Sequence, residues 1–365
     1  MIDISDFGLG NSFQQRKGVS NMGLDITLII TSFISTIVLL WLLKPIASNI
    51  GLIDSPGGRK RHQGDIPLIG GLGIFFSTVI FTLNSSSSFE YYLPLVTISG
   101  LLLLVGAIDD AKNLPVKHRL SIQIFAGFLM IIFGNNKLTS FGDILFLGDI
   151  DLGFLSIPLT LIAVCGCINA HNMTDGADGL SGGLTLITLS SLGILAYINK
   201  MDPPLSFIII LSCTVAAFLQ LNFRFPWNKR ASVFLGDSGS MMLGFIIAWF
   251  LISFTQGETQ IIRPAIALWI FAVPLLDIFS TMIRRIKRGA SPFTPGRDHI
   301  HHILIDQGLS VRKSVVAIYT IATACAFIGI VGHIYNLNES LMFLAFALLF
   351  VAYFAATSIY APGET

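Results

Sequence analysis

Long apolar runs restrict the folds open to this chain of 365 residues more than any other feature. A helix needs about 20 predominantly apolar residues to cross the roughly 30 Å hydrocarbon core of a bilayer. Eleven runs approach that length, so we predict an all-α, polytopic integral membrane protein with about 11 transmembrane helices. The runs are 26–43, 67–83, 92–108, 120–133, 152–168, 180–198, 203–221, 241–254, 264–283, 314–334 and 340–359.

The composition favours the same class of protein. The mean hydropathy is +0.77 and 12% of the residues are charged, whereas soluble domains carry about a quarter. A net charge of +1 does not favour a nucleic-acid partner. No internal repeat is visible, so we predict a single polytopic catalytic domain at 26–359, between an external segment at 1–25 and a short cytoplasmic tail at 360–365.

The basic residues predict how the helices are oriented. If the N-terminus lies outside, seventeen Lys and Arg residues fall in the loops of one side and five on the other. Lys and Arg concentrate in cytoplasmic loops, so the richer side and the C-terminus are predicted to be cytoplasmic. The unusual polar residues lie on this side as well, in the loops 54–71, 108–119, 169–183, 222–240 and 284–302. We therefore expect the active site in the cytoplasmic loops.

Two adjacent acids end the third apolar run. Asp109 and Asp110 would lie at the membrane interface, where ionised side chains need a cation nearby. Lys117 and Arg119 follow in the same loop. A solvated helix end is the simpler alternative. A DDxxD prenyl-diphosphate motif is excluded, because the fifth position is Asn113.

The segment "FLGDSGS" places Asp237 between glycines at the start of a run. Glycines allow close backbone approach, and a helix N-terminus attracts anions. A carboxylate beside amides that bind phosphate suits Mg²⁺, which takes one or two protein oxygens together with phosphates and water. A plain helix cap is the alternative.

The stretch "INAHNMTDGADGLSGG" carries four polar residues at intervals of three, namely Asn169, Asn172, Asp175 and Asp178. In a helix this spacing forms one stripe, and the glycines that follow predict that the helix breaks here. In either case we expect the four side chains to converge. The alternative is a stripe that only bonds neighbouring helices.

The segment "PGRDHIHH" groups one arginine with three histidines, namely Arg297, His299, His301 and His302. The spacing is not that of a zinc site. We expect a cationic pocket for phosphate or sugar, with a basic loop that merely sets topology as the alternative. Acids that hold a metal, facing bases that hold phosphates, suit a reaction between two anionic substrates, one of them attached to a lipid.

Five quoted motifs carry a family resemblance: "RKRHQGDIPLIGG", "GAIDDAKNLPVKHR", "NAHNMTDGADGLSGG", "VFLGDSGS" and "RRIKRGASPFTPGRDHIHH". Their order and spacing resemble the polyprenyl-phosphate N-acetylhexosamine-1-phosphate transferases, or glycosyltransferase family 4, from about residue 26 to 359. The H-I-H-H form is similar to the GlcNAc-1-phosphate branch, of WecA type, which begins O-antigen and enterobacterial common antigen synthesis.

The resemblance implies transfer of GlcNAc-1-phosphate from UDP-GlcNAc to undecaprenyl phosphate, with UMP leaving, in the bacterial cytoplasmic (inner) membrane. It implies Mg²⁺ as cofactor, with Mn²⁺ as a substitute, and direct displacement is favoured. Another UDP-N-acetylhexosamine (GalNAc, QuiNAc or FucNAc) and a homodimer stay open. A secondary transporter is a distant alternative, because the polar clusters lie at one face rather than at the midplane.

The resemblance also implies roles for individual residues. Many relatives carry a carboxylate where this chain has Asn113, and His171 receives no role. The implied metal ligands are Asp237 and Asn172. Four acids are implied to be catalytic, namely Asp109, Asp110, Asp175 and Asp178; the first two would position or deprotonate the acceptor phosphate, and Lys117 and Arg119 would neutralise it. The implied donor residues are Asn169, Asp175 and Asp178 at the nucleotide, Asn222 and Phe234 at the uracil, Arg297, His299, His301 and His302 at the sugar phosphate, and Lys60 and His62 elsewhere at the substrate.

Overall fold

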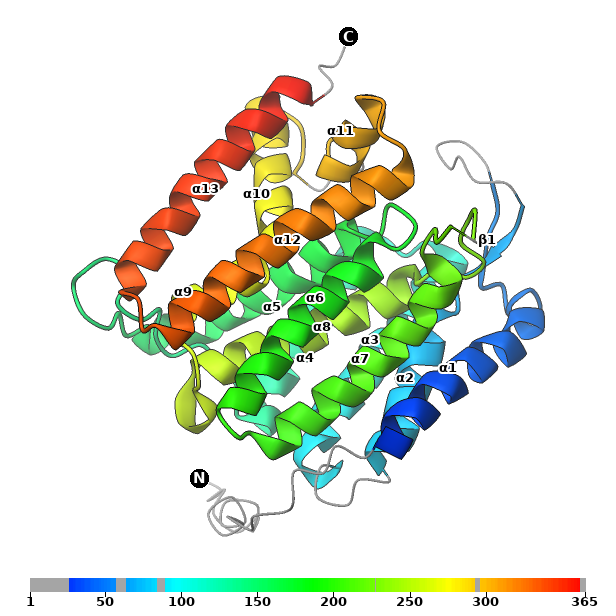
Figure 1. Ribbon diagram of the computed structural model, residues 1–365, viewed down its shortest axis with the longest axis horizontal. Coiled ribbons are helices and arrows are strands. Elements are labelled where there is room, and N and C mark those ends of the chain that lie inside the picture. The colour runs from blue at the N-terminus through cyan, green and yellow to red at the C-terminus, as the bar shows by residue number, and fades with distance from the viewer. Residues whose placement is uncertain (1–25, 57–63, 84–88, 227, 293–295, 362–365) are drawn as a thin grey trace.

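The computed structural model is a bundle of helices that run roughly side by side between two ends (Figure 1). It describes residues 26–56, 64–83, 89–226, 228–292 and 296–361. The predicted external segment 1–25 lies outside the described residues, as do Lys60 and His62. What was expected of them stays a prediction.

Helices make up almost all of the regular structure in these ranges, which confirms the all-α prediction. The helices are α1 (Ile26–Ala47), α2 (Gly70–Leu83), α3 (Phe89–Lys112), α4 (Val116–Gly134), α5 (Ser156–Met173), α6 (Leu180–Ile198), α7 (Asp202–Asn222), α8 (Gly236–Thr255), α9 (Pro264–Ile270), α10 (Ala272–Lys287), α11 (Ile300–Asp306), α12 (Val311–Ile334) and α13 (Glu339–Tyr360). Two short 3-10 turns, η2 (Gly153–Leu155) and η3 (Gly257–Thr259), and the antiparallel strand pair β1 (Ile53–Asp54) and β2 (Ile66–Pro67) complete the elements.

The eleven predicted runs correspond to three kinds of segment. Nine helices in the described ranges are long and apolar enough to cross a membrane. The helix α2 has 14 residues and reaches about 21 Å, which is shorter than a hydrocarbon core. The run 264–283 is broken into α9 and α10, which meet at 84°. These helices have the length and composition expected of a multi-pass membrane protein.

The break between α9 and α10 has a local cause. Pro274 lies in the first turn of α10. A proline has no N–H, so the hydrogen bond from residue 274 to the carbonyl of Ile270 cannot form, and the ring crowds that carbonyl. The chain turns at Phe271, whose φ is −109° and ψ is 27°.

The helix α8 is the most enclosed of the spanning helices. In its most apolar stretch 94% of the residues are buried, against 17% for α1 and 22% for α13. Glycines let α2 and α3 approach its first turn. A Cβ on Gly71 would lie 2.4 Å from the Gly239 backbone, and one on Gly106 would lie 2.4 Å from the Ser238 backbone. These contacts fix where the N-terminus of α8 sits.

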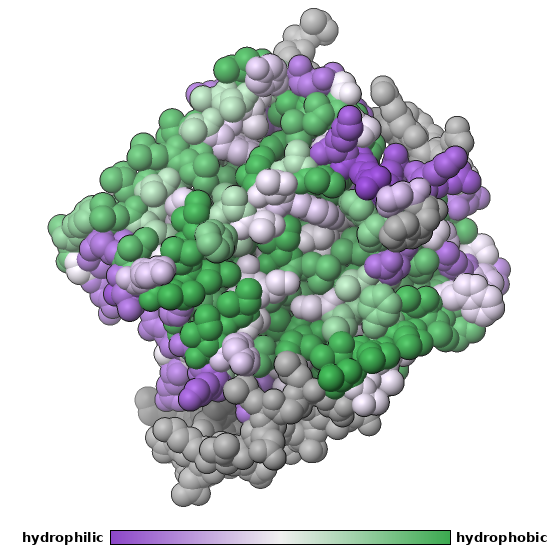
Figure 2. Space-filling model, in the orientation of Figure 1, coloured by the Kyte–Doolittle hydropathy of each residue, from purple (hydrophilic) through white to green (hydrophobic). Residues whose placement is uncertain are grey.

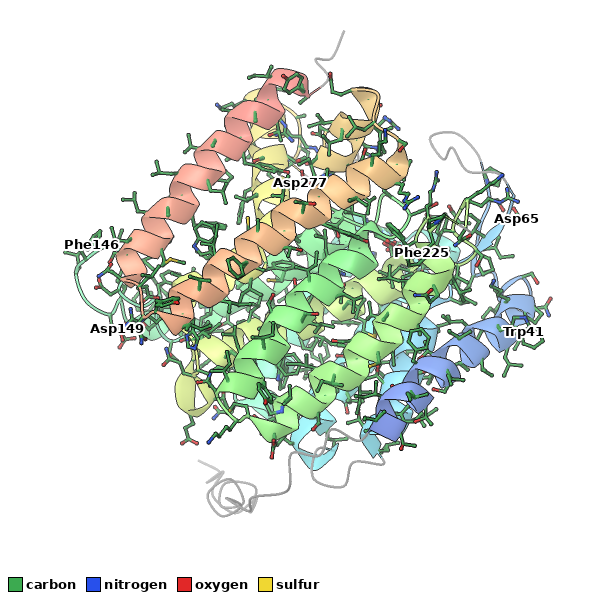
Figure 3. All side chains as sticks on the ribbon, viewed as in Figure 1. Trp41, Asp65, Phe146, Asp149, Phe225 and Asp277 are labelled. Atoms are coloured by element: carbon green, nitrogen blue, oxygen red, sulfur yellow. The ribbon has the colours of Figure 1, made fainter. Side chains whose placement is uncertain are left out.

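Polar residues gather at the two ends of the bundle, with an apolar band between them (Figure 2). Figure 3 places Asp65 and Phe225 toward one end, and Phe146 and Asp149 at the other. Large apolar side chains such as Trp41, Ile132 and Leu348 are exposed on the helices between. This is the pattern expected where lipid rather than water covers the protein. The end that holds Phe225 is the predicted cytoplasmic one.

Candidate active site

The N-terminus of α8 is held by an acid from another helix. Asp110, near the end of α3, accepts hydrogen bonds from the backbone N–H groups of Asp237 (2.8 Å) and Ser238 (3.1 Å). A carboxylate there satisfies two orphan amides and complements the helix dipole. Gly236 adopts a φ of +76°, and a Cβ on it would lie 2.6 Å from Asp110 Oδ2. The anion that this helix start was expected to attract is thus, at these two amides, the carboxylate of Asp110.

The two residues predicted as metal ligands are in contact. Asn172, in the last turn of α5, donates from Nδ2 to Asp237 Oδ1 at 2.6 Å. The same nitrogen lies 2.8 Å from Ser240 Oγ. The Asp237 side chain is 33% exposed. One helix end and one helix start therefore present an amide and an accessible carboxylate side by side.

Arg119 joins the acids of α3 and α8. Its Nη1 lies 3.2 Å from Asp109 Oδ2 and 3.8 Å from Asp237 Oδ2. The other oxygen of Asp109 accepts the Leu114 N–H at 2.6 Å. Asn113 ends α3 with a φ of 52°, a left-handed conformation that asparagine tolerates well. The amide at position 113 therefore suits the turn that brings Arg119 back to Asp109.

Asp175 lies in the turn between α5 and α6 and completes the acidic group. Burial raises its pKa well above the usual range, and repulsion from Asp237, Asp110 and Asp178 raises it further. The Gly236 N–H opposes this rise. The part of the chain that the structure describes holds no group of three or more His, Cys, Asp or Glu arranged for a metal ion. The acids form a crowded cluster rather than a complete coordination shell.

The polar stripe of α5 divides instead of converging. The helix ends at Met173, as the glycines predicted. Asn172 faces Asp237, but Asn169 donates to Gln123 Oε1 on α4 at 2.7 Å. The expected convergence of all four side chains is wrong, because Gln123 on α4 engages Asn169 and Arg224 engages Asp178, which leaves only Asn172 and Asp175 near Asp237. The proposed contact of Asn169 with a nucleotide stays a prediction.

Asp178 and Asn222 hold the loop between α7 and α8. Asp178 accepts from Arg224 Nε at 2.7 Å. Asn222 is 5% exposed; its Nδ2 donates to the Val233 carbonyl and its Oδ1 accepts the Gly179 N–H, both at 2.8 Å. Because both ends of this amide are engaged with backbone, the geometry does not favour the expected contact of Asn222 with uracil.

Two further predicted residues lie at the rim. Phe234 lies two residues before Gly236; its N–H donates to the Pro67 carbonyl (2.8 Å) and its carbonyl accepts the Gly70 N–H (2.9 Å). Lys117 is exposed in the first turn of α4, two positions before Arg119. Both residues are near the acidic cluster along the chain, and their substrate contacts stay predictions.

His171, whose role was left open by the sequence, is a buried link between α5 and α6. Its Nε2 lies 3.0 Å from Ser181 Oγ and 3.1 Å from Thr185 Oγ1. A Cβ on Gly244 would lie 3.1 Å from the His171 Cβ, so the side chain also packs close to α8. These contacts fix α5 next to the turn that carries Asp175.

The histidines meet the acidic cluster from the far end of the sequence. The rings of His299 and His301 are parallel within 7° at 6.0 Å, and His301 and His302 lie 4.1 Å apart. A Cβ on Gly176 would lie 2.3 Å from His301 Nε2. The buried ring of His301 therefore packs on the turn that follows Asp175, and the two clusters form one site.

The charge of this loop differs from the expected cationic pocket. Burial, together with repulsion from neighbouring cationic groups, lowers the pKa of His301 to about 3 and that of His302 to about 4. Both rings are thus neutral near pH 7. Arg297 is paired with Asp306 at 2.8 Å. The prediction was wrong about the two histidines, because a cation there would lose its hydration.

Four functional residues of this region were not predicted. Arg285 binds the Asp298 carboxylate with Nε at 3.0 Å and Nη2 at 2.6 Å. Arg284 donates to the Asp298 carbonyl at 2.5 Å, and Asp277 lies 2.7 Å from His299 Nδ1. In the sequence both arginines served only as topology signals. The acid at 277, inside an apolar run, was the signal that could have revealed the network.

Comparison with known proteins places this site in a family. A model of glycosyl transferase family 4 matches residues 92–255. A Haemophilus influenzae protein named undecaprenyl-phosphate alpha-N-acetylglucosaminyl 1-phosphate transferase is 39% identical over 328 residues, or 89% of this chain and 92% of that protein. Proteins with the same name from Yersinia pestis and Escherichia coli K12 are each 36% identical, over 90% and 89% of both chains. The chain belongs to glycosyl transferase family 4.

Membership in glycosyl transferase family 4 confirms the resemblance inferred from the motifs. The segment that matches the family model runs from α3 to α8 and holds the whole acidic cluster. The histidine loop lies beyond it, yet the fold returns that loop to the same end of the bundle through His301 and Gly176.

Proposed function

We propose that this chain transfers GlcNAc-1-phosphate from UDP-GlcNAc to undecaprenyl phosphate and releases UMP. The observation that carries the proposal is the union of the acidic cluster with the histidine loop, where His301 packs on Gly176 at one polar end of a membrane bundle. A reaction between two phosphorylated substrates needs cations to offset their repulsion, which a metal ion held by the acids and the guanidinium of Arg119 would supply, while the neutral histidines offer hydrogen bonds to the sugar. A site at the end of spanning helices suits a lipid acceptor, and the named relatives support the choice of substrates.

Mg²⁺ is the cofactor that the acidic cluster fits, with Mn²⁺ as a substitute. Asp109, Asp110, Asp175 and Asp237 lie around the start of α8, and Arg119 contacts only two of them within the described residues. Such an excess of carboxylate oxygens suits a hard cation whose coordination shell is completed by phosphates and water. Asp237 and the adjacent Asn172 would hold it. When bound, Mg²⁺ would withdraw charge from the diphosphate oxygens and so ease the departure of UMP.

The acceptor side relies on Arg119 and Lys117. Their cations would neutralise the lipid phosphate and bring it to the donor. A phosphate monoester has a second pKa of about 6, so the acceptor is ionised near neutrality and needs little help from a base. Its oxygen bonds to the β-phosphorus while the bond between that phosphorus and the bridging oxygen to UMP breaks. Asp110 takes part by holding α8 rather than by removing a proton.

The donor side combines the turn after α5 with the histidine loop. Asp175 and Asp178 flank Gly176, on which His301 packs. Neutral imidazoles of His301 and His302 can donate or accept hydrogen bonds with sugar hydroxyls, and Arg297 would turn to the sugar phosphate. The nucleotide would then lie near α5 and the sugar near α11.

The excess of Lys and Arg in the loops of one side supports the orientation of the site. By that rule the site and the C-terminus lie in the cytoplasm and the N-terminus lies outside. Cytoplasmic UDP-sugars and an acceptor anchored in the bacterial inner membrane would meet there.

The test uses the full chain purified into lipid nanodiscs with undecaprenyl phosphate and radiolabelled UDP-GlcNAc. We expect labelled lipid and an equal amount of UMP. D237N should abolish both, whereas the matched control D149N, at the opposite end of the bundle, should not. UDP-GalNAc and the deoxy-amino sugars QuiNAc and FucNAc as UDP donors test the choice of sugar. Solute uptake into proteoliposomes without labelled lipid would refute the transferase in favour of a transporter.

A further inference from the structure

The last helix, α13, is mostly exposed on the outside of the bundle, yet it carries two buried side chains with hydroxyl groups. In its most apolar stretch only 22% of the residues of α13 are buried. Tyr353 and Thr357, one turn apart on this helix, are nevertheless buried against the bundle. Polar groups buried inside a membrane protein are kept where they have partners and a function.

Tyr353 acts on an acid that fixes the histidine loop. Its hydroxyl donates to Asp277 Oδ1 at 3.0 Å. The same carboxylate accepts the Ile300 N–H at 2.9 Å and pairs with His299 Nδ1 at 2.7 Å. The Ile300 N–H belongs to the first residue of α11, so Asp277 holds both His299 and the start of α11.

Thr357 acts on the same loop through a cation. Its Oγ1 accepts from Arg284 Nη1 at 2.7 Å. The other terminal nitrogen of this guanidinium donates to the Asp298 carbonyl, immediately before His299. Arg285 holds the Asp298 side chain independently. Residues 298–300 are thus clamped from α10, and α13 supports both the acid and one arginine of the clamp.

The clamp reaches the site through the histidine rings. His299 is parallel to His301, and His301 packs on Gly176 beside Asp175. A shift of His299 would therefore move the ring that borders the donor side. The acceptor side, at Arg119 and Asp109, is bonded to α3, α4 and α8 instead.

We propose that Tyr353 and Thr357 are positioning residues of the donor site, which set the histidine loop for the UDP-sugar without touching it. The inference rests on the proposed function. It predicts a selective effect: removal of either hydroxyl weakens the use of UDP-GlcNAc and leaves the use of undecaprenyl phosphate intact.

The experiment measures KM for each substrate in nanodiscs for Y353F and T357V. The KM for UDP-GlcNAc should rise about tenfold in each variant, the change that the loss of one hydrogen bond to a charged group gives. The KM for undecaprenyl phosphate should change less than twofold. T357S retains the hydroxyl and should restore the normal KM. Y360F on the exposed end of α13 and T320V, whose hydroxyl donates to the Val316 carbonyl within α12, are matched controls.

Direct binding of UDP-GlcNAc, measured by calorimetry without acceptor, gives a second readout. A tenfold weaker Kd in Y353F and T357V, in protein that still gives a cooperative melting transition, supports the inference. Unchanged donor KM and Kd in both variants, or equal weakening of both substrates, overturns it. If the unaltered protein neither binds UDP-GlcNAc nor releases UMP, the proposed function fails instead, so the two failures are distinguishable.

Discussion

Replacing Asp110 by asparagine tests whether an acid of α3 holds α8 in place. The carboxylate accepts two backbone N–H groups, those of Asp237 and Ser238, at 2.8 and 3.1 Å. An amide of the same shape keeps one acceptor but turns an NH₂ group toward the other N–H. Loss of a helix cap costs about 1 kcal/mol, and a buried donor without a partner adds a similar amount. We therefore expect D110N to lower the free energy of unfolding by about 2 kcal/mol.

The same substitution should also reduce turnover, because one of the two N–H groups that Asp110 holds belongs to Asp237 itself. Once that N–H is released, the Asp237 side chain can shift. A misplacement of roughly 1 Å in a catalytic group can cost about 100-fold in rate. UMP release and the melting temperature in nanodiscs measure the two effects, with D149N as the control. G236A should behave alike, since its Cβ would meet Asp110 Oδ2 at 2.6 Å, and the double variant should be less than additive. A loss of activity with no loss of stability would refute the reasoning and place Asp110 on the substrate.

Three further predictions concern protonation, the loop before α8 and the metal. Because burial lowers the pKa of His301 to about 3, the unfolded chain (pKa about 6.5) gains a proton below pH 6.5 that the folded chain does not. The contribution of His301 to stability should thus fall by about 2 kcal/mol between pH 8 and pH 5, and the loss of stability over this range, measured by chemical unfolding, should be smaller by that amount in H301Q. N222A leaves the Gly179 N–H and the Val233 carbonyl without partners, so it should lose about 3 kcal/mol in the same assay; a loss below 1 kcal/mol would contradict this. EDTA should stop UMP release and Mg²⁺ or Mn²⁺ should restore it, except in D237N; full activity in EDTA would remove the metal from the proposal.

The sequence predicted the span positions well and their continuity poorly. Runs such as 203–221 became single helices because their backbone can be satisfied only within the helix in lipid. The run 264–283 is broken at Phe271. This break was not predicted, because the hydropathy of the run carries no sign of the 84° bend. The shortness of α2 was equally hidden, because apolar residues continue before Gly70 in the segment that pairs with Phe234.

Within the site, the sequence identified residue types more reliably than their partners. The pair Asn172 and Asp237 was predicted together, and the structure joins them. Asn113 is explained by its left-handed backbone, and His171 by hydroxyls on α6. Neither reason can be read from the sequence, because the backbone conformation of Asn113 and the contact of His171 with α6 both depend on how the helices pack.

By itself the sequence determined that the chain is helical, that it spans a membrane many times and that its polar motifs share one face. These properties follow from hydropathy, charge and spacing along the chain. Only the tertiary structure decided that Asp110 caps α8 from 127 residues away and that His301 rests on Gly176. It also decided that α13 supports the histidine loop through Tyr353 and Thr357. The reason is physical: hydropathy acts on each segment separately, whereas the partner of a buried polar group is set by which helices pack together.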